Sequence, residues 1–313
     1  MKISKFFVPI LGLPLVLGTG LTTLVSCKDK NDSVNAFEND SWTTIVFFAN
    51  RGLDALKNHY GLDSFVGLER TVKIYGVEHK VRVVGENEDY LADNEGKPDI
   101  TKPVALTFQF ANIVSGLNDE GTIMPLPLPF DTTTYLFSYW GGSAVRKFLR
   151  GEGYYKDYSF YDELKQQLGN NAIKEVVKYS MLMNDLAKPG IETLFLPGIT
   201  DIFNVEQTYE YVDEDFIGEA TLVEGEEIQY HEPYSYYRNA IDQDDEQAPR
   251  NRQRVLALTD ADGFYEPYWL RTSCVNEIGT EEDPTKTLSI SADGKWNRTT
   301  SATQLHIAPI FCI

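Results

Sequence analysis

The sequence is short of the residue types that most often carry catalysis or bind metals. It holds three cysteines and four histidines in 313 residues. No histidine stands in an HExxH or His-x-His setting, and no two cysteines have the spacing of a zinc site. The sequence therefore excludes the common zinc-enzyme motifs, and no catalytic role is predicted for any of its histidines, which are His59, His79, His231 and His306.

Basic residues are also scarce. The chain has 28 Lys and Arg against 47 Asp and Glu, and from Cys27 onward 26 basic residues face 47 acidic ones, a formal net charge of −21. Such a surface repels phosphate backbones and anionic headgroups, which argues against binding to nucleic acid or to lipid headgroups. The acidity is explained either by solubility or by an affinity for cations.

Long apolar runs are confined to the first 26 residues. Lys2 and Lys5 precede an apolar run over 6–24 that contains two prolines, and Leu24-Val25-Ser26-Cys27 follows. This order is typical of a signal peptide, and its end resembles a bacterial lipobox, in which the cysteine becomes the lipidated N-terminus. The alternative, a transmembrane anchor, is disfavoured by the prolines and by the Ser-Cys pair. We therefore predict lipidation of Cys27 and a chain attached by lipid to the extracellular face of the cell membrane.

The remaining chain divides into a short tether and one domain. Residues 28–33 are polar and too poor in apolar residues to pack, so residues 27–36 are predicted to form a flexible tether that begins at the lipidated cysteine. No internal repeat or low-complexity linker interrupts residues 37–313, which are predicted to be a single extracellular domain.

The spacing of apolar residues predicts an α+β fold, an antiparallel sheet core with several short helices. Helices are expected over 42–58, 140–150, 161–168 and 171–181, the second and third capped by Ser143 and Ser159. Strands are expected over 71–75, 79–84, 104–110, 193–196, 255–258 and 268–272. The first two strands are predicted to form a hairpin around Gly76, and the segment 268–313 the closing pair of strands.

Several motifs occur in the order of one known family. They are Trp42; 84–91 (VGENEDYL); Leu106-Thr107-Phe108; Trp140 with Ser143, Arg146 and Leu149; 193–196 (TLFL); 226–230 (EEIQY); Trp269-Leu270-Arg271-Thr272; and 307–313 (IAPIFCI). The chain thereby resembles a bacterial extracellular domain of unknown function, often joined to immunoglobulin-like repeats, with a Trp-Leu-Arg-Ser signature and a Gly-Val-Ala-Phe-Gly-Phe-Cys-Ile ending. Glu88, Tyr90 and Thr272 depart from its His, Asp and Ser. The ending is also similar to C-type lectin-like domains, which implies a fold but no function.

The motif residues have a structural and a ligand-binding interpretation. Trp140, Ser143, Arg146, Trp269 and Leu270 are taken as a structural signature. Arg271 is a candidate ligand-binding residue, but if it is buried beside Trp269 it needs a carboxylate or carbonyl partner, because an unpaired buried charge is strongly destabilising. The tyrosines in 230–237 are either an exposed surface that contacts a glycan or protein, or rings packed on the core; they are Tyr230, Tyr234, Tyr236 and Tyr237.

Two further features, an acidic loop and a pair of cysteines, each have two alternative interpretations. The acidic loop 86–99 offers carboxylate and amide oxygens that suit Ca²⁺, with Glu86, Asn87, Asp89 and Asp93 as the candidate ligands. It does not match EF-hand spacing, which favours the alternative of a solvated loop. No other cofactor is predicted. Cys274 and Cys312 remain as an even pair in an oxidising compartment and are either a disulfide or two free thiols.

Two functions are compatible with these features. The first is a binding or display module on the cell surface for an extracellular glycan or protein, and the second is an envelope enzyme that acts on glycans or peptidoglycan. The enzyme would use carboxylates of 86–99 and 224–227, which would have to face each other across a cleft. A purely structural envelope protein is the third alternative.

Overall fold

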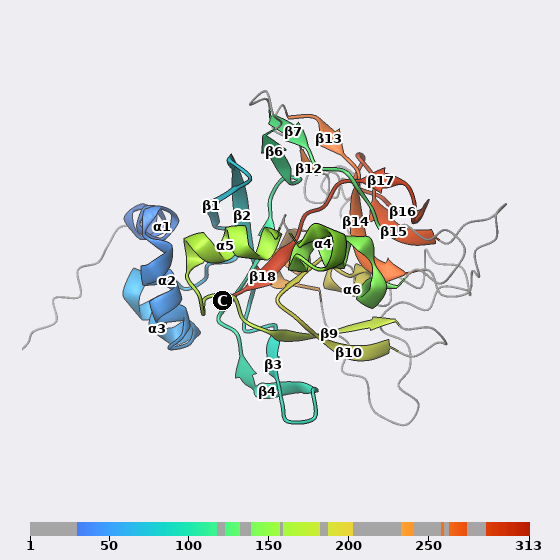
Figure 1. The fold of residues 1–313 in the computed structure, drawn as a ribbon. Coiled ribbons are helices and arrows are strands. Elements are labelled where there is room, and N and C mark those ends of the chain that lie inside the picture. The colour runs from blue at the N-terminus through green and yellow to red at the C-terminus, as the bar shows by residue number, and fades with distance from the viewer. Residues whose placement is uncertain are drawn as a thin grey trace, which may run out of the picture.

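The computed structural model describes residues 30–117, 123–131, 139–156, 159–181, 187–202, 233–240, 258–259, 263–273 and 286–313. The signal peptide and Cys27 lie outside these residues. Across the described ranges, no helix is both long enough and apolar enough to cross a membrane. The architecture is α+β, with antiparallel sheets and several short helices, as predicted (Figure 1).

The largest sheet has five strands in the order β1-β2-β5-β18-β11, and every neighbouring pair is antiparallel. The strands are β1 (Glu69–Ile74), β2 (Val77–Glu86), β5 (Leu106–Phe110), β18 (Ile310–Cys312) and β11 (Leu194–Phe195). The predicted hairpin is confirmed, with Ile74 opposite Val77. β18 lies between β5 and β11, so the sheet cannot be completed until residues 310–312 have been made.

Two smaller sheets flank this one. The four-stranded sheet has the order β10-β9-β3-β4, built from β10 (Ala187–Glu192), β9 (Val176–Met181), β3 (Tyr90–Ala92) and β4 (Pro98–Pro103). The three-stranded sheet joins β14 (Tyr268–Ser273), β15 (Lys286–Ile290) and β16 (Trp296–Thr300). The short pairs are β6 (Ser115–Leu117) with β7 (Ile123–Pro125), β8 (Leu128–Pro129) with β17 (Gln304–Leu305), and β12 (Leu258–Thr259) with β13 (Tyr265–Glu266).

The prediction that 268–313 forms a closing pair of strands is therefore wrong. β14 and β18 lie in different sheets, because β14 pairs with β15 while β18 pairs with β5 and β11. The two segments still approach each other, since Tyr268 forms a parallel bridge with His306.

The N-terminal helices differ from the prediction in two ways. Residues 30–36 are not a tether, because α1 (Lys30–Asn39) forms there and buries Phe37 against the rings of Tyr60 and Phe65. The single helix expected over 42–58 is two, α2 (Trp42–Ala49) and α3 (Leu53–Tyr60). Gly52 causes the break, because its φ of 96° is a conformation that a helix cannot contain.

The next helices were predicted well where a cap marks their start. Ser143 caps α4 (Ala144–Arg150) and Ser159 caps α5 (Phe160–Leu168), each accepting a backbone N–H three residues on. These helices cross one face of the five-stranded sheet (Figure 1). The helix expected over 171–181 is wrong, because Val176 begins β9, where branched side chains are favoured and Leu91 of β3 supplies a partner. The remaining helices are the short η1 (Trp140–Gly142), η2 (Gly153–Tyr155), α6 (Ile199–Ile202) and α8 (Ser235–Ala240).

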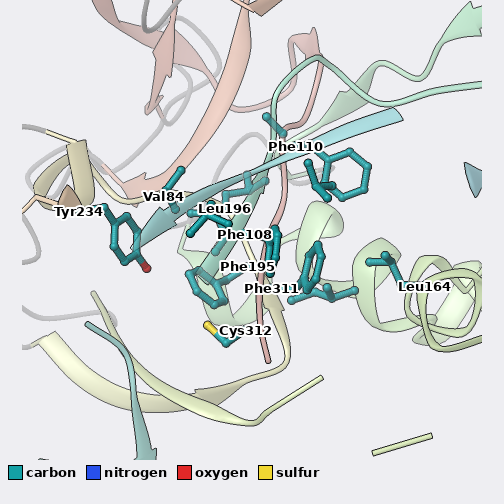
Figure 2. Packing of buried hydrophobic residues seen from close by; sticks show 14 of the residues in the cluster. Val84, Phe108, Phe110, Leu164, Phe195, Leu196, Tyr234, Phe311 and Cys312 are labelled. Atoms are coloured by element: carbon teal, nitrogen blue, oxygen red, sulfur yellow. The ribbon is translucent and has the colours of Figure 1, made fainter. Parts of the chain in front are cut away.

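One hydrophobic cluster connects these layers and reaches from Phe37 to Ile313. Its centre is aromatic: the rings of Phe108 and Phe311 stack 5.3 Å apart on adjacent strands, and Trp42 of α2 meets both edge-on. Figure 2 shows Phe108 and Phe311 within the cluster, together with Phe195, Tyr234 and Cys312, which border the site described next.

Candidate functional site

Four charged side chains meet in the interior, each at most 3% exposed. They are Asp89, Lys178, Asp201 and Arg271, called here the buried ionic network. The four come from different places: the loop before β3, strand β9, helix α6 and strand β14. Two carboxylates and two cations balance in charge, which is the condition under which buried charges are tolerated.

Lys178 lies between the two carboxylates. Its Nζ is 2.5 Å from Asp89 Oδ1 and 3.7 Å from Asp201 Oδ1, and it donates to the Tyr234 hydroxyl at 2.7 Å. The rings of Phe195 and Tyr234 lie 4.7 and 5.0 Å from the ammonium group, close enough for cation–π attraction. The amine is therefore held by two charges, one hydroxyl and two aromatic faces.

The second carboxylate oxygen of Asp89, Oδ2, accepts hydrogen bonds from uncharged donors. Oδ2 accepts from the Thr107 hydroxyl at 2.6 Å, from the Tyr234 hydroxyl at 2.9 Å and from the Cys312 thiol at 3.4 Å. Burial raises the pKa of the Tyr234 phenol and of the Cys312 thiol well above their ordinary values. Both groups therefore keep their protons at neutral pH and serve as donors.

Asp201 connects β14, the strand that contains Arg271, to the loop that precedes α6. Its Oδ2 accepts from Arg271 and from the Gly198 N–H at 2.8 Å, while Arg271 Nη1 also donates to the Leu196 carbonyl at 3.0 Å. Thr272 adds to this contact by accepting the Ile199 N–H at 2.9 Å. Arg271 thus has both the carboxylate and the carbonyl partner that its burial requires.

Tyr234 reaches the network because β2 contains a glycine beneath its ring. A Cβ on Gly85 would lie 2.8 Å from Tyr234 Cδ1 and 2.6 Å from Glu88 Oε2. Glu88 in turn accepts the Ser235 N–H at 3.0 Å and pairs with Arg238, so it fixes the start of α8. The space over Gly85 is what allows α8 to dock on β2.

Gly85→Ala is expected to destabilise the protein by about 1–3 kcal/mol, because the added methyl overpacks this contact. Urea denaturation of the variant and parent measures the effect. Gly190→Ala is the comparison, since it also lies in a strand without a positive φ, and a Cβ there would make only ordinary contacts, the nearest with Glu192 Oε1 at 3.4 Å. Equal losses in the two variants would mean that the Tyr234 contact contributes nothing.

The candidate calcium ligands are not gathered at one point. Glu86 pairs with Lys57 at 3.0 Å and accepts from Ser64, Asp89 belongs to the ionic network, and Asp93 accepts the N–H groups of Glu95 and Lys97 within its own loop. Asn87 occupies a left-handed turn at φ 55°. Among the described residues, no three His, Cys, Asp or Glu side chains are grouped to hold a metal ion.

The tyrosines do not form an exposed face where the structure describes them. Tyr234 and Tyr237 are buried, and Tyr236 is half-buried. The Tyr237 hydroxyl donates to Gln109, and the Tyr236 hydroxyl accepts from Arg82 at 2.6 Å. The interpretation of rings packed on the core therefore holds for these three, and Tyr230 lies outside the described residues.

Of the two alternatives left open for the cysteine pair, the structure shows the free thiol at Cys312. Cys312 is a free thiol enclosed by Thr107 and Asp89, and its strand leaves no exposed route to the sulfur. Cys274 lies outside the described residues.

The residues of the structural signature, namely Trp140, Ser143, Arg146, Trp269 and Leu270, lie in the core or contact other parts of the chain. Arg146 Nε contacts both oxygens of Glu192 at 2.9 and 3.0 Å, while Trp140 is buried beside Phe130. Burial raises the pKa of the Glu192 carboxyl, although Arg146 favours its charged form. Trp269 and Leu270 are fully buried, and the indole N–H of Trp269 donates to the Leu128 carbonyl at 2.8 Å.

Ser143→Ala is expected to lower the free energy of unfolding by about 0.5–2 kcal/mol, because the first turn of α4 loses its capping acceptor for the Arg146 N–H. Thermal denaturation followed by circular dichroism measures the loss. Ser143→Thr retains a capping hydroxyl without adding a charge at this buried position and should recover most of the stability, whereas equal melting of all three proteins would contradict the capping role.

Sequence reasoning selected Asp89 as a metal ligand, Tyr234 and Arg271 as ligand contacts and Cys312 as a possible disulfide partner, and the structure brings the four together. It missed Lys178, Asp201 and Thr107, whose local sequence carries no signal for burial of a charge or hydroxyl. The need of a buried Arg271 for a carboxylate was the one available clue. No family model, no curated protein and no solved structure matches the chain.

Proposed function

We propose that the chain is a lipid-anchored binding or display module on the cell surface and that its ligand is an extracellular glycan or protein. The lipobox-like Leu24-Val25-Ser26-Cys27 supports the anchor, and the net charge from Cys27 onward supports an extracellular, soluble body. The resemblance to the extracellular Trp-Leu-Arg-Ser family, with a lectin-like architecture, is part of the same proposal.

The observation that supports the binding role best is that the ionic network holds Asp201 and Tyr234, the described residues on either side of an acidic segment. The Tyr234 N–H donates to the Asp201 carbonyl at 3.0 Å, and both side chains contact Lys178. Asp201 and Tyr234, which lie in the described segments on either side of residues 203–232, are thereby fixed to the core. That segment holds ten acidic residues and no Lys or Arg. A rigid scaffold that presents a polar segment is the usual arrangement of a binding surface.

The enzyme alternative draws less support from the acidic loop. The Glu86, Glu88 and Asp89 carboxylates each hold another part of the chain through Lys57, Arg238 and Lys178 respectively. Glycoside hydrolysis needs two carboxyl groups on either side of the scissile bond, with access for substrate. These three are engaged in separate structural contacts.

Cys27→Ser is expected to abolish membrane association, because the lipid has no other attachment point in the lipobox-like sequence. The measurement is fractionation of cells together with incorporation of a labelled fatty acid into the parent and the variant. Cys274→Ser is the matched control and should behave as the parent does. Label retained in Cys27→Ser would contradict lipid attachment at this residue.

A glycan and protein array probed with the purified chain, with and without Ca²⁺, tests the binding role. The triple variant Glu224→Gln, Glu226→Gln, Glu227→Gln is expected to bind at least roughly tenfold more weakly, or about 1.4 kcal/mol. Glu95→Gln, in an exposed loop, is the control and should bind as the parent does. Absence of binding, combined with hydrolysis of cell-wall fragments, would favour the enzyme instead.

A further inference from the structure

One short contact in the ionic network joins a nucleophile, the Lys178 amine, to a carboxyl group. Lys178 Nζ lies 2.5 Å from Asp89 Oδ1, and the carboxyl carbon is one bond beyond that oxygen. The pair is aligned by the sheet: Leu91 is opposite Val176, and continuing this antiparallel register by two residues places Asp89 opposite Lys178. We propose that Lys178 and Asp89 condense into an isopeptide bond, which links β9 covalently to the loop before β3.

The second oxygen of Asp89 has the donors that this reaction requires. Attack on the carboxyl carbon places negative charge on Oδ2, which already accepts from Thr107 at 2.6 Å, Tyr234 at 2.9 Å and Cys312 at 3.4 Å. Donors that are in place before charge develops are the main element of an oxyanion site. After condensation, the same three groups hydrogen-bond the amide oxygen.

Asp201 is placed to move the protons. Its Oδ1 lies 3.7 Å from Lys178 Nζ, while Arg271 and the Gly198 N–H hold its other oxygen. One proton passes from the ammonium group to Asp89 Oδ1, and the neutral amine attacks the carboxyl carbon to form the carbon–nitrogen bond. Asp201 accepts a second proton from the nitrogen and delivers it to the same Oδ1, and the carbon–oxygen bond breaks to release water.

The reaction balances without any other reactant. An ammonium and a carboxylate become a neutral amide and one water, so four buried charges become two. The remaining pair, Asp201 and Arg271, is still matched. Since each buried ion is costly to desolvate, removal of two charges from the interior favours the condensed form. The surrounding Phe195 and Tyr234 rings exclude bulk water from the amide.

Peptide mapping of the purified full-length chain tests the proposal. The chain is denatured, digested with trypsin and a second protease, and analysed by tandem mass spectrometry. The expected product is a branched peptide containing Asp89 and Lys178, lighter by one water than its two linear parts, with no tryptic cleavage after Lys178. Linear peptides and full cleavage after Lys178 would overturn the proposal, and this decision depends on no variant.

The chain contains its own control. Lys73 and Glu78 are also opposite on adjacent antiparallel strands, but both are exposed, so their peptides should remain linear. Lys178→Met should abolish the branched peptide. Asp201→Asn keeps the shape but cannot accept the proton, and the branched product should fall to a trace while circular dichroism still reports a folded chain. Full branching in folded Asp201→Asn would overturn the assigned role of Asp201.

Discussion

Asp201→Ala is expected to lower the free energy of unfolding by about 3–5 kcal/mol, because it leaves the Arg271 guanidinium buried without its carboxylate. The change also removes the acceptor of the Gly198 N–H, so the start of α6 loses its fixation. Since the free energy of unfolding of a folded domain is about 5–15 kcal/mol, a loss of this size would leave the protein only marginally stable. Denaturation in urea, followed by circular dichroism, measures it.

Two comparisons separate charge from shape in that experiment. Asp201→Asn keeps the size of the side chain and one acceptor oxygen, so the difference between the Asn and Ala variants reports the volume and the hydrogen bond. Glu95→Ala removes an exposed carboxylate and should change stability by no more than about 0.5 kcal/mol. An Asp201→Ala protein as stable as Glu95→Ala would show that the network contributes nothing.

Phe311→Ala is expected to cost about 3–5 kcal/mol, the range observed for deletion of a buried ring. Phe311 is fully buried on β18, an inner strand of the five-stranded sheet, where its ring stacks on Phe108 and lies edge-on to Trp42. The cavity would open between β18 and β5, two strands that are far apart in the sequence. Thermal and urea denaturation both measure the loss.

Tyr154→Ala is the matched control for that variant, because it also deletes a ring but at a position that is 87% exposed. Its stability should fall within about 0.5 kcal/mol of the parent. Similar losses in the two variants would contradict the position of β18 in the core of the sheet.

The elements that the sequence predicted correctly are those with a local cause. Ser143 and Ser159 mark helix starts because a hydroxyl three residues before a free N–H can cap it, and that spacing is visible in the sequence. The β1–β2 hairpin follows from alternation about Gly76. The segment 171–181 failed because its apolar spacing fits a helix, while the deciding contact, with Leu91 of β3, is far away in the chain.

The candidate site was predicted in fragments for the same reason. A buried Arg271 implied a carboxylate, but nothing local identifies Asp201 as that partner, 70 residues earlier. Tyr234 was expected to be either exposed or packed, and the choice depends on Gly85, which leaves room for its ring on another strand. Asp89 was grouped with its neighbours as a calcium ligand, although strand register directs it to Lys178.

The central claim, that the buried charges act as one unit, is tested most directly by a double-mutant cycle on Asp201 and Arg271. The free energy of unfolding is measured for the parent, Asp201→Ala, Arg271→Met and the double variant. The double variant should lose about 1–3 kcal/mol less than the two single losses added together, because each single change leaves the other charge unpaired. Losses that add to within about 0.5 kcal/mol would contradict the account.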